Sequence, residues 1–199
     1  PKPMLKVGDR PIMETILENL IEHGFKNFCI SVNHMADIVK NYFKDGSKWN
    51  ASISYLEETQ KMGTAGALSL ISKPQTEPIL VVNGDLLTKV NFSHLLDFHK
   101  NMGAEATMGV REYDFQVPYG VVRIDEHLIT GIDEKPVQKF FVNAGIYCLE
   151  PGVLNHIPAN THLDMPTLFE KLIANKKETA VFPIREYWLD IGQVADYNR

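Results

Sequence analysis

Ile79-Leu80-Val81-Val82-Asn83-Gly84-Asp85 is the stretch from which the fold can be worked out. Four consecutive apolar residues before a polar turn are typical of a strand buried in a sheet that is covered on both faces. In open α/β sheets, ligands bind just beyond the carboxyl ends of the strands, where Asp85 would lie. A carboxylate there can hold a hard cation such as Mg²⁺, which takes oxygen ligands and often accompanies phosphates.

A second aspartate, Asp190 in Trp188-Leu189-Asp190-Ile191-Gly192, is a candidate ligand for the same cation. The alternative for Asp85 is a turn residue or a helix cap, because Asn-Gly-Asp is favourable turn chemistry. Two distant aspartates around a pocket with lysine and glycine residues nevertheless indicate metal-assisted chemistry on a phosphate.

The rest of the chain favours an α/β fold. Helical and strand patterns alternate over residues 1–103, which predicts a Rossmann-like mixed, mainly parallel sheet with helices on both faces. The expected helices are 11–23, 37–43, 64–71 and 92–102, and the expected strands are 28–32, 53–56 and 79–82.

The second half changes character, because its strands follow one another with short turns. The expected strands there are 104–111, 120–124, 129–134, 141–149 and 179–183, and the expected helices are 153–156 and 166–174. This pattern indicates antiparallel additions to the sheet, which could cover a ligand. We therefore predict a single domain over residues 1–199, with halves at 1–103 and 104–199.

Composition excludes several function classes. The 199 residues are 44% hydrophobic and carry a formal net charge of −5, which leaves no basic surface for nucleic acid. No apolar run approaches the roughly 20 residues of a membrane span. We therefore expect small-molecule ligands and no nucleic-acid or membrane partner.

Cysteine and histidine usage gives further expectations. Cys29 and Cys148 lie in strand-like runs, so we expect buried free thiols. These cysteines and the lack of a signal-peptide pattern favour a reducing cytoplasm. The histidines show no metal-ligand spacing, and His94 and His99 on one helix are expected to face solvent.

Two further segments could bind a ligand. Residues 61–67, Lys-Met-Gly-Thr-Ala-Gly-Ala, follow a strand and open a helix, where glycines allow close approach and free N–H groups attract anions or base edges. The alternative is a simple turn with Thr64 as the helix cap. In Glu134-Lys135-Pro136, Glu134 could accept hydrogen bonds from sugar hydroxyls and Lys135 could pair with a phosphate, although an exposed polar turn is equally consistent.

Glycines in the strand-like runs Tyr119-Gly120-Val121-Val122 and Asn143-Ala144-Gly145 suggest a bulge or close ligand approach. Taken in order with the segments above and Pro1-Lys2-Pro3-Met4, these motifs resemble the sugar-1-phosphate nucleotidylyltransferases, also called NDP-sugar pyrophosphorylases. The match covers nearly the whole chain, and seven short motifs in the right order make it specific.

The resemblance implies the reaction NTP + sugar 1-phosphate → NDP-sugar + pyrophosphate. It implies that Asp85 and Asp190 hold Mg²⁺ and that Lys2 neutralises the phosphates. It places Gly63, Thr64 and Gly66, with Asp85, on the nucleotide, so that 1–103 is the nucleotide-binding half. The implied sugar-binding residues in 104–199 are Gly120, Glu134, Asn143 and Gly145, with Lys135 on the sugar phosphate.

One departure from the family pattern matters. The family carries a strand and a Gly-rich loop just before the stretch that matches Pro1-Lys2-Pro3, and that segment is absent from this sequence. We therefore expect a truncated catalytic domain that binds NTP poorly. Assembly into a homo-oligomer remains open. The motifs look most like the mannose-1-phosphate guanylyltransferase branch, while uridylyl, cytidylyl and thymidylyl transfer remain open.

Two other functions remain open at this stage. A non-catalytic domain of the same fold could sense NDP-sugars, which the missing loop favours and the retained Lys2, Asp85, Lys135 and Asp190 disfavour. A metal-dependent glycosyltransferase is the weaker alternative, because such enzymes usually carry Asp-x-Asp where this chain has Asn83-Gly84-Asp85.

Overall fold

A computed structural model describes residues 2–192, and its core is a four-stranded sheet in the order β11-β7-β10-β5. The strands are β5 (Ile79–Val82), β7 (Ala106–Gln116), β10 (Val137–Leu149) and β11 (Thr179–Pro183). β10 runs antiparallel to β5 and β7, whereas β11 runs parallel to β7. The α/β class with a mixed sheet is confirmed, although parallel pairing is less common than we expected.

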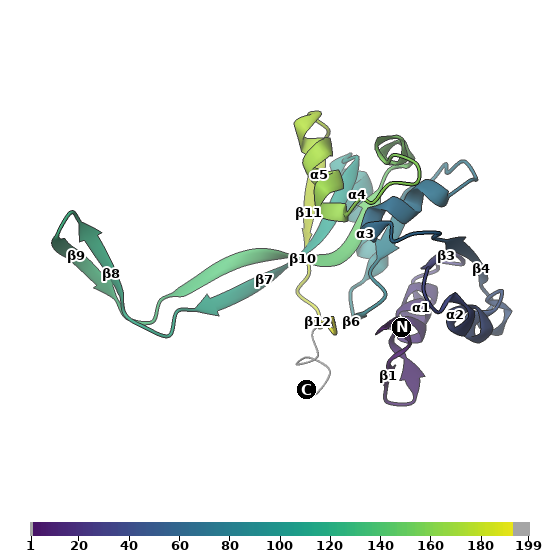
Figure 1. The fold of residues 1–199 in the computed structure, drawn as a ribbon, viewed down its shortest axis with the longest axis horizontal. Coiled ribbons are helices and arrows are strands. Elements are labelled where there is room, and N and C mark those ends of the chain that lie inside the picture. Colours follow the sequence, from purple (N-terminus) through teal and green to yellow (C-terminus); the bar gives the residue numbers. More distant parts are fainter. Residues whose placement is uncertain (1, 193–199) are drawn as a thin grey trace.

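Helices cover both faces of this sheet (Figure 1). Because side chains alternate along a strand, successive residues of β10 enter different cores. Ile146 and Cys148 pack with α1 (Ile12–Glu22) and α4 (Phe92–Met102). Tyr147 and Leu149 pack on the other face with α3 (Gly63–Gly66), η4 (Pro151–His156) and α5 (Met165–Ala174).

A smaller layer lies beside this sheet. β3 (Asn27–Val32) pairs in parallel with β4 (Ser52–Glu57), and α2 (Ala36–Phe43) packs on them through Val39 and Phe43. Among residues 2–192, β3 pairs only with β4 and β5 pairs only with β10, so each strand keeps one unpaired edge. Cys148 is buried as predicted, but the prediction for Cys29 is wrong, because this thiol is exposed on β3.

Four very short strands were not predicted. β1 (Lys6–Val7) and β2 (Arg10–Pro11) form a small hairpin after the 3₁₀ turn η1 (Lys2–Met4). β6 (Leu86–Thr88) and β12 (Trp188–Asp190) pair with each other in antiparallel orientation. Two or three residues are too few to show the alternation that marks a strand in sequence.

The second half also forms a long arm. β7 and β10 continue beyond the sheet as a two-stranded ribbon, and the hairpin of β8 (Val121–Asp125) and β9 (Leu128–Asp133) lies at its far end (Figure 1). The predicted antiparallel additions are therefore confirmed. No helix within residues 2–192 has the length and apolarity that a membrane crossing requires.

Three helix-related predictions need correction. The helix expected at 64–71 is one α turn, α3, followed by the 3₁₀ helix η3 (Ala67–Leu70), and 153–156 lies in the 3₁₀ helix η4. His94 is exposed as expected, whereas His99 is fully buried. Its Nδ1 lies 2.8 Å from Thr107 Oγ1 and its Nε2 lies 3.1 Å from Glu150 Oε1, so polar partners on the sheet make its burial possible.

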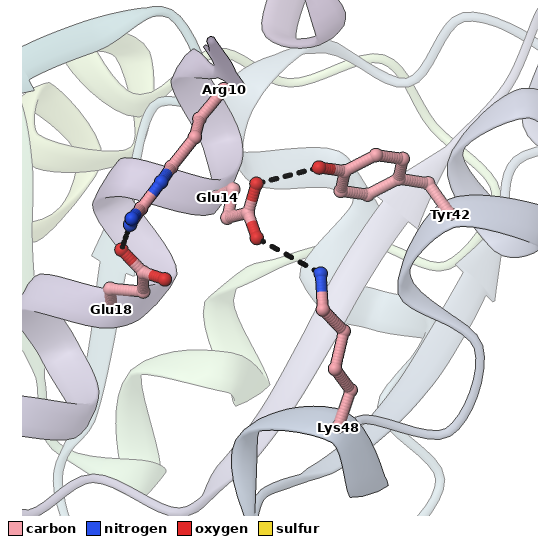
Figure 2. Close-up of polar contacts among 5 residues, drawn as sticks. All are labelled: Arg10, Glu14, Glu18, Tyr42 and Lys48. Carbon is pink, nitrogen blue, oxygen red and sulfur yellow. Dashed lines mark hydrogen bonds and ion pairs between the residues drawn. The ribbon is translucent and has the colours of Figure 1, made fainter.

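A buried carboxylate joins α1 to the smaller layer (Figure 2). Glu14 accepts hydrogen bonds from Tyr42 Oη at 2.6 Å and from Lys48 Nζ at 3.3 Å, and Lys48 follows α2 in the 3₁₀ helix η2 (Ser47–Trp49). Burial opposes ionisation of Glu14, but these two partners outweigh it, so its pKa lies below its usual value. The same contact raises the pKa of Tyr42 to about 12.

We predict that Tyr42→Phe lowers the free energy of unfolding by about 1–2 kcal/mol at pH 7, because a buried carboxylate loses a hydrogen bond. Glu14 has a lowered pKa in the folded state, so its contribution is present above its unfolded pKa and is lost as the pH falls. The deficit of the variant should therefore shrink in acid. Urea unfolding from pH 7 to pH 4 measures it, with the exposed Tyr113→Phe as the matched control. An equal deficit at both pH values would contradict this account of Glu14.

Candidate active site

The turn Asn83-Gly84-Asp85 connects β5 to β6 and lies against the start of the chain. A Cβ atom on Gly84 would lie only 3.1 Å from Pro3 Cγ and 3.2 Å from Met13 Cε. The turn can therefore pack closely on η1 and α1 because residue 84 has no side chain. This packing brings the segment that carries Lys2 to the turn that carries Asp85.

The strand β12 brings the second aspartate to the same turn. Asp190 is the register partner of Leu86, the residue after Asp85. The N–H of Ile191 donates to the carbonyl oxygen of Asp85 at 3.0 Å and extends the pairing by one step. The predicted association of Asp85 with Asp190 is therefore present in the fold, and two very short strands produce it.

The electrostatics of Asp85 reflect this arrangement. Burial, followed by the charge of Asp190, raises the pKa of Asp85, and the nearby Lys2 ammonium partly offsets both effects. Both causes disfavour a second negative charge at this turn. The ionised form of Asp85 is therefore disfavoured in this position, and a bound cation would stabilise it.

Lys2 closes the site from the side of η1. Its Nζ donates to the carbonyl oxygen of Gly192 at 2.9 Å, and the N–H of Gly192 donates to Asp190 Oδ1 at 2.7 Å. One ammonium and two carboxylates therefore meet around the 190–192 turn. Pro1, which precedes this lysine in its motif, lies outside the described residues.

A β-bulge in β10 lies next to the segments that carry the two aspartates. The pairing of β10 with β7 shifts between Asn143 and Tyr147, and Gly145 adopts φ +70°, which favours glycine. Asn143 Oδ1 accepts from the N–H of Gly145 at 2.9 Å, and Asn143 Nδ2 donates to Tyr147 Oη at 2.7 Å. Both the oxygen and the nitrogen of the Asn143 amide are therefore hydrogen-bonded within β10.

This bulge contacts both segments that carry the aspartates. The N–H of Asn83 donates to the carbonyl oxygen of Gly145 at 2.8 Å, and Trp188 Nε1 donates to the carbonyl oxygen of Ala144 at 2.8 Å. A Cβ atom on residue 145 would lie 2.6 Å from Asn83 Nδ2. The structure thus places Gly145 against the turn that carries Asp85, and Asn143 lies two residues before it on the same bulge.

The segment Gly63–Gly66 is hydrogen-bonded to the start of α5. Thr64 does not cap its own helix, because its Oγ1 accepts from the N–H of Met165 at 2.8 Å, at the start of α5. Its N–H donates to Asp164 Oδ1 at 3.0 Å. The N–H groups of Ala65 and Gly66 both donate to the carbonyl oxygen of Leu163 at 2.9 Å. Asp164 was missed in the sequence, although an Asp two residues before Pro166 is a typical helix-start signal.

The remaining predicted sugar-site residues lie on the arm. Glu134 Oε2 lies 3.0 Å from where a Cβ of Gly120 would be, so these two positions face each other at the base of the β8–β9 hairpin. Lys135 follows with φ 46°. This part of the arm is well separated from β6 and β12 (Figure 1). The structure therefore does not bring Gly120, Glu134 and Lys135 to the aspartate pair.

Comparison with known proteins decides the family. The family model described as "Nucleotidyl transferase" matches residues 1–199. The chain belongs to the nucleotidyl transferase family. It is 35% identical over 208 residues to "Probable mannose-1-phosphate guanylyltransferase 3" of Oryza sativa subsp. japonica, covering 99% of this chain and 57% of that protein. It is 31% identical to "UTP--glucose-1-phosphate uridylyltransferase" of Synechocystis sp., covering 99% of this chain and 56% of the relative.

Solved structures share the fold. HddC from Yersinia pseudotuberculosis superposes with a TM-score of 0.76 at 22% identity, covering 100% of this chain and 87% of that one. A putative glucose-1-phosphate thymidylyltransferase from Bacillus anthracis gives 0.76 at 21% identity, with 100% and 84% coverage. The chain spans little more than half the length of the curated relatives that it matches.

The oxygen atoms of the Asp85 and Asp190 carboxylates are of the kind that Mg²⁺ prefers. Mg²⁺ is commonly held by one or two carboxylates and keeps waters and substrate phosphates as its other ligands. Within residues 2–192, no group of three or more His, Cys, Asp or Glu side chains is arranged to hold a metal. The Asp85–Asp190 pair, with one pKa raised partly by its neighbour, is the arrangement that a divalent cation would stabilise.

We predict that Asp85→Asn stabilises the fold at pH 7 by about 2–4 °C in Tm, the shift that roughly 1 kcal/mol produces in a domain of this size. A raised folded-state pKa means that ionisation of Asp85 costs stability, and this cost grows as the pH rises through that pKa. The gain should therefore be larger at pH 7 than at pH 4. Calorimetry measures it, and Asp97→Asn on the exposed side of α4 is the control.

The same experiment reports on the cation. MgCl₂ should raise the Tm of the wild-type chain above its value in KCl of equal ionic strength, because a ligand that binds only the folded state stabilises it. Asp85→Asn should lose this response, whereas Asp97→Asn should keep it. If Asp85→Asn is less stable than wild type at pH 7, this result would contradict the repulsion that we assign to Asp85.

Proposed function

We propose that this domain catalyses nucleotidyl transfer from an NTP to a sugar 1-phosphate and releases pyrophosphate. The observation that carries the proposal is the convergence of Lys2, Asp85 and Asp190 on one turn in a chain of the nucleotidyl transferase family. The names of relatives that are more than 30% identical, which include guanylyl and uridylyl transferases acting on sugar 1-phosphates, support it.

The chemistry asks little covalent work of the protein. The sugar phosphate oxygen attacks the α-phosphorus in line with the departing pyrophosphate, so positioning and charge neutralisation supply most of the rate enhancement. Mg²⁺ bound at Asp85 and Asp190 would neutralise phosphate oxygens. Lys2 can exchange its contact with the Gly192 carbonyl for a phosphate oxygen, which places an ammonium beside the reacting centre.

The hydrogen-bonded amide of Asn143 suits a positioning role in this reaction. Its Nδ2 carries two hydrogens, and Tyr147 takes only one of them, so the second can bind a sugar hydroxyl. Because Gly145 and Tyr147 fix the amide, little side-chain freedom would be lost on binding. Gly120, Glu134 and Lys135 would join it when the arm bends toward the body or when another copy supplies them.

For the substrates, we propose GTP with a hexose 1-phosphate, in keeping with the names of the relatives from rice, and UTP as the alternative. Gly63, Thr64 and Gly66 would line the nucleobase pocket. The unpaired edges of β3 and β5 support a further strand, contributed by a segment outside residues 2–192, that completes the sheet and leads into a phosphate-binding loop. A cytoplasmic location fits the two free cysteines.

We predict pyrophosphate release with one NTP–sugar phosphate pair in a coupled assay with Mg²⁺, using the chain joined to the family strand and Gly-rich loop. Asp190→Ala should reduce kcat by about 10²–10³-fold, because a positioned charge at the reacting centre is lost. Gly145→Ala should raise KM for the sugar phosphate, because its Cβ would displace Asn83 and the bulge.

Two matched variants control this experiment. Asp97→Ala removes an exposed carboxylate on α4, and Gly152→Ala adds a methyl group where nothing lies within 4 Å, so both should retain activity. Release that survives Asp190→Ala would reject the metal role of this residue. A folded protein that binds an NDP-sugar without releasing pyrophosphate from any pair would instead identify a sensor domain.

A further inference from the structure

The chain changes sheets between β11 and β12. β11 belongs to the main sheet, whereas β12 pairs with β6, so residues 184–187 lead from one sheet to the other (Figure 1). Ile184 is buried in the core, and Trp188 at the start of β12 packs against the same core. Between them, Arg185 and Tyr187 are exposed. Apolar burial therefore holds the two ends of this segment better than its middle.

Arg111 holds the middle of the segment from the neighbouring strand β7. The preceding residue, Val110, accepts the N–H of Ile184 on its carbonyl oxygen at 2.8 Å, which extends the pairing of β11 with β7. Arg111 Nη1 then donates to the carbonyl oxygen of Ile184 at 3.2 Å and to that of Glu186 at 2.8 Å. A single nitrogen of a half-buried arginine thus binds two carbonyl groups of the segment, and hydrogen bonds from a charged donor are stronger than those between neutral groups.

The strand β12 depends on such contacts because it is short. It has three residues, and within the described part of the chain it pairs with β6 alone. An isolated pair of strands is at best marginally stable in water, so the position of β12 follows the contacts at its two ends. Near Asp190, these are the contacts with Lys2 and Asp85. At the other end, the carbonyl oxygen of Tyr187 accepts the N–H of Lys89 at 2.9 Å.

The path from the Arg111 contacts to the candidate site is short. Glu186 is four residues before Asp190, which is at most roughly 14 Å of extended chain. A shift of the Glu186 carbonyl group is therefore passed along β12 to the carboxylate of Asp190. A misplacement of about 1 Å at a positioned group can lower a reaction rate by about a hundredfold.

We propose that Arg111 is a positioning residue for Asp190. By fixing the carbonyl groups of Ile184 and Glu186, it sets the point from which β12 starts, and so the place of the Asp190 carboxylate. Arg111 itself acts only through β12 and touches none of the reacting atoms. Its effect on catalysis rests on the proposed function, whereas its effect on β12 can be measured without substrate or Mg²⁺.

Hydrogen–deuterium exchange with mass spectrometry measures the effect on β12 in the chain without ligands. Arg111→Met should speed exchange about tenfold at residues 186–192 and in β6, because two charge-assisted hydrogen bonds are lost and the β6–β12 pairing opens more often. β11 and α1 should keep their wild-type rates. Arg111→Lys should restore part of the protection, because one nitrogen makes both contacts and an ammonium can also donate to two carbonyl groups.

Arg123→Met is the matched control for this experiment. It removes the guanidinium of a side chain that is 64% exposed on the hairpin of the arm, so residues 186–192 should exchange as in wild type. Equal acceleration of β11 and α1 in Arg111→Met would show that Arg111 supports the fold as a whole, and this result would overturn the proposal. Unchanged exchange over residues 186–192 would overturn it as well.

A double-mutant cycle on kcat in the pyrophosphate-release assay measures the effect on catalysis. Arg111→Met should lower kcat by about 10–100-fold. In the Asp190→Ala background, the same substitution should lower kcat by less than about twofold, because a positioning residue has no effect once the group that it positions is gone. Effects that simply multiply would show that Arg111 acts independently of Asp190.

Failure of the proposed function would give a different result from failure of this inference. If wild type releases no pyrophosphate from any NTP–sugar phosphate pair, the same cycle is measured on the rise of Tm with MgCl₂. Arg111→Met should then reduce the rise that wild type shows and should change nothing in the Asp190→Ala background. An equal response in wild type and Arg111→Met would overturn the role of Arg111 at Asp190.

Discussion

The antiparallel pairing of β6 with β12 is the contact on which the candidate site depends. It joins the segment after β5 to the last described strand and sets Asp190 beside Leu86, so that Ile191 can donate to the carbonyl of Asp85. The carbonyl of Gly192 then meets Lys2, which draws the start of the chain into the same place. Three charged groups from three separate segments, Lys2, Asp85 and Asp190, are thereby brought close together.

Glu14, which is buried, and Asp85, which is half-buried, differ in what decides the pKa of their carboxyl groups. At Glu14, hydrogen bonds from Tyr42 and Lys48 outweigh the cost of burial, so the pKa falls and the ionised group stabilises the fold. At Asp85, burial and Asp190 outweigh Lys2, so the pKa rises. Perturbed groups of the second kind are typical of functional sites, because a ligand supplies the missing charge.

The sequence predicted secondary structure best where the pattern of apolar residues is long. The helices at α1 and α4 and the strand β5 could be predicted from apolar spacing, since each buries a continuous face. β6 and β12 could not, because three residues carry no period. His99 was misjudged because its two polar partners, Thr107 and Glu150, lie outside its helix, and only the fold brings them to the ring. The exposure of Cys29 depends on what packs against its face of β3, and a local pattern contains no such information.

The most direct test of the central claim is a double-mutant cycle of Asp85→Asn and Asp190→Asn on the free energy of unfolding at pH 7 without Mg²⁺. If the two carboxylates repel each other across the β6–β12 pairing, either substitution removes the same repulsion. The double variant should then gain less stability than the sum of the single variants, by about 0.5 kcal/mol or more. Additive effects would show that the two aspartates do not form one electrostatic site.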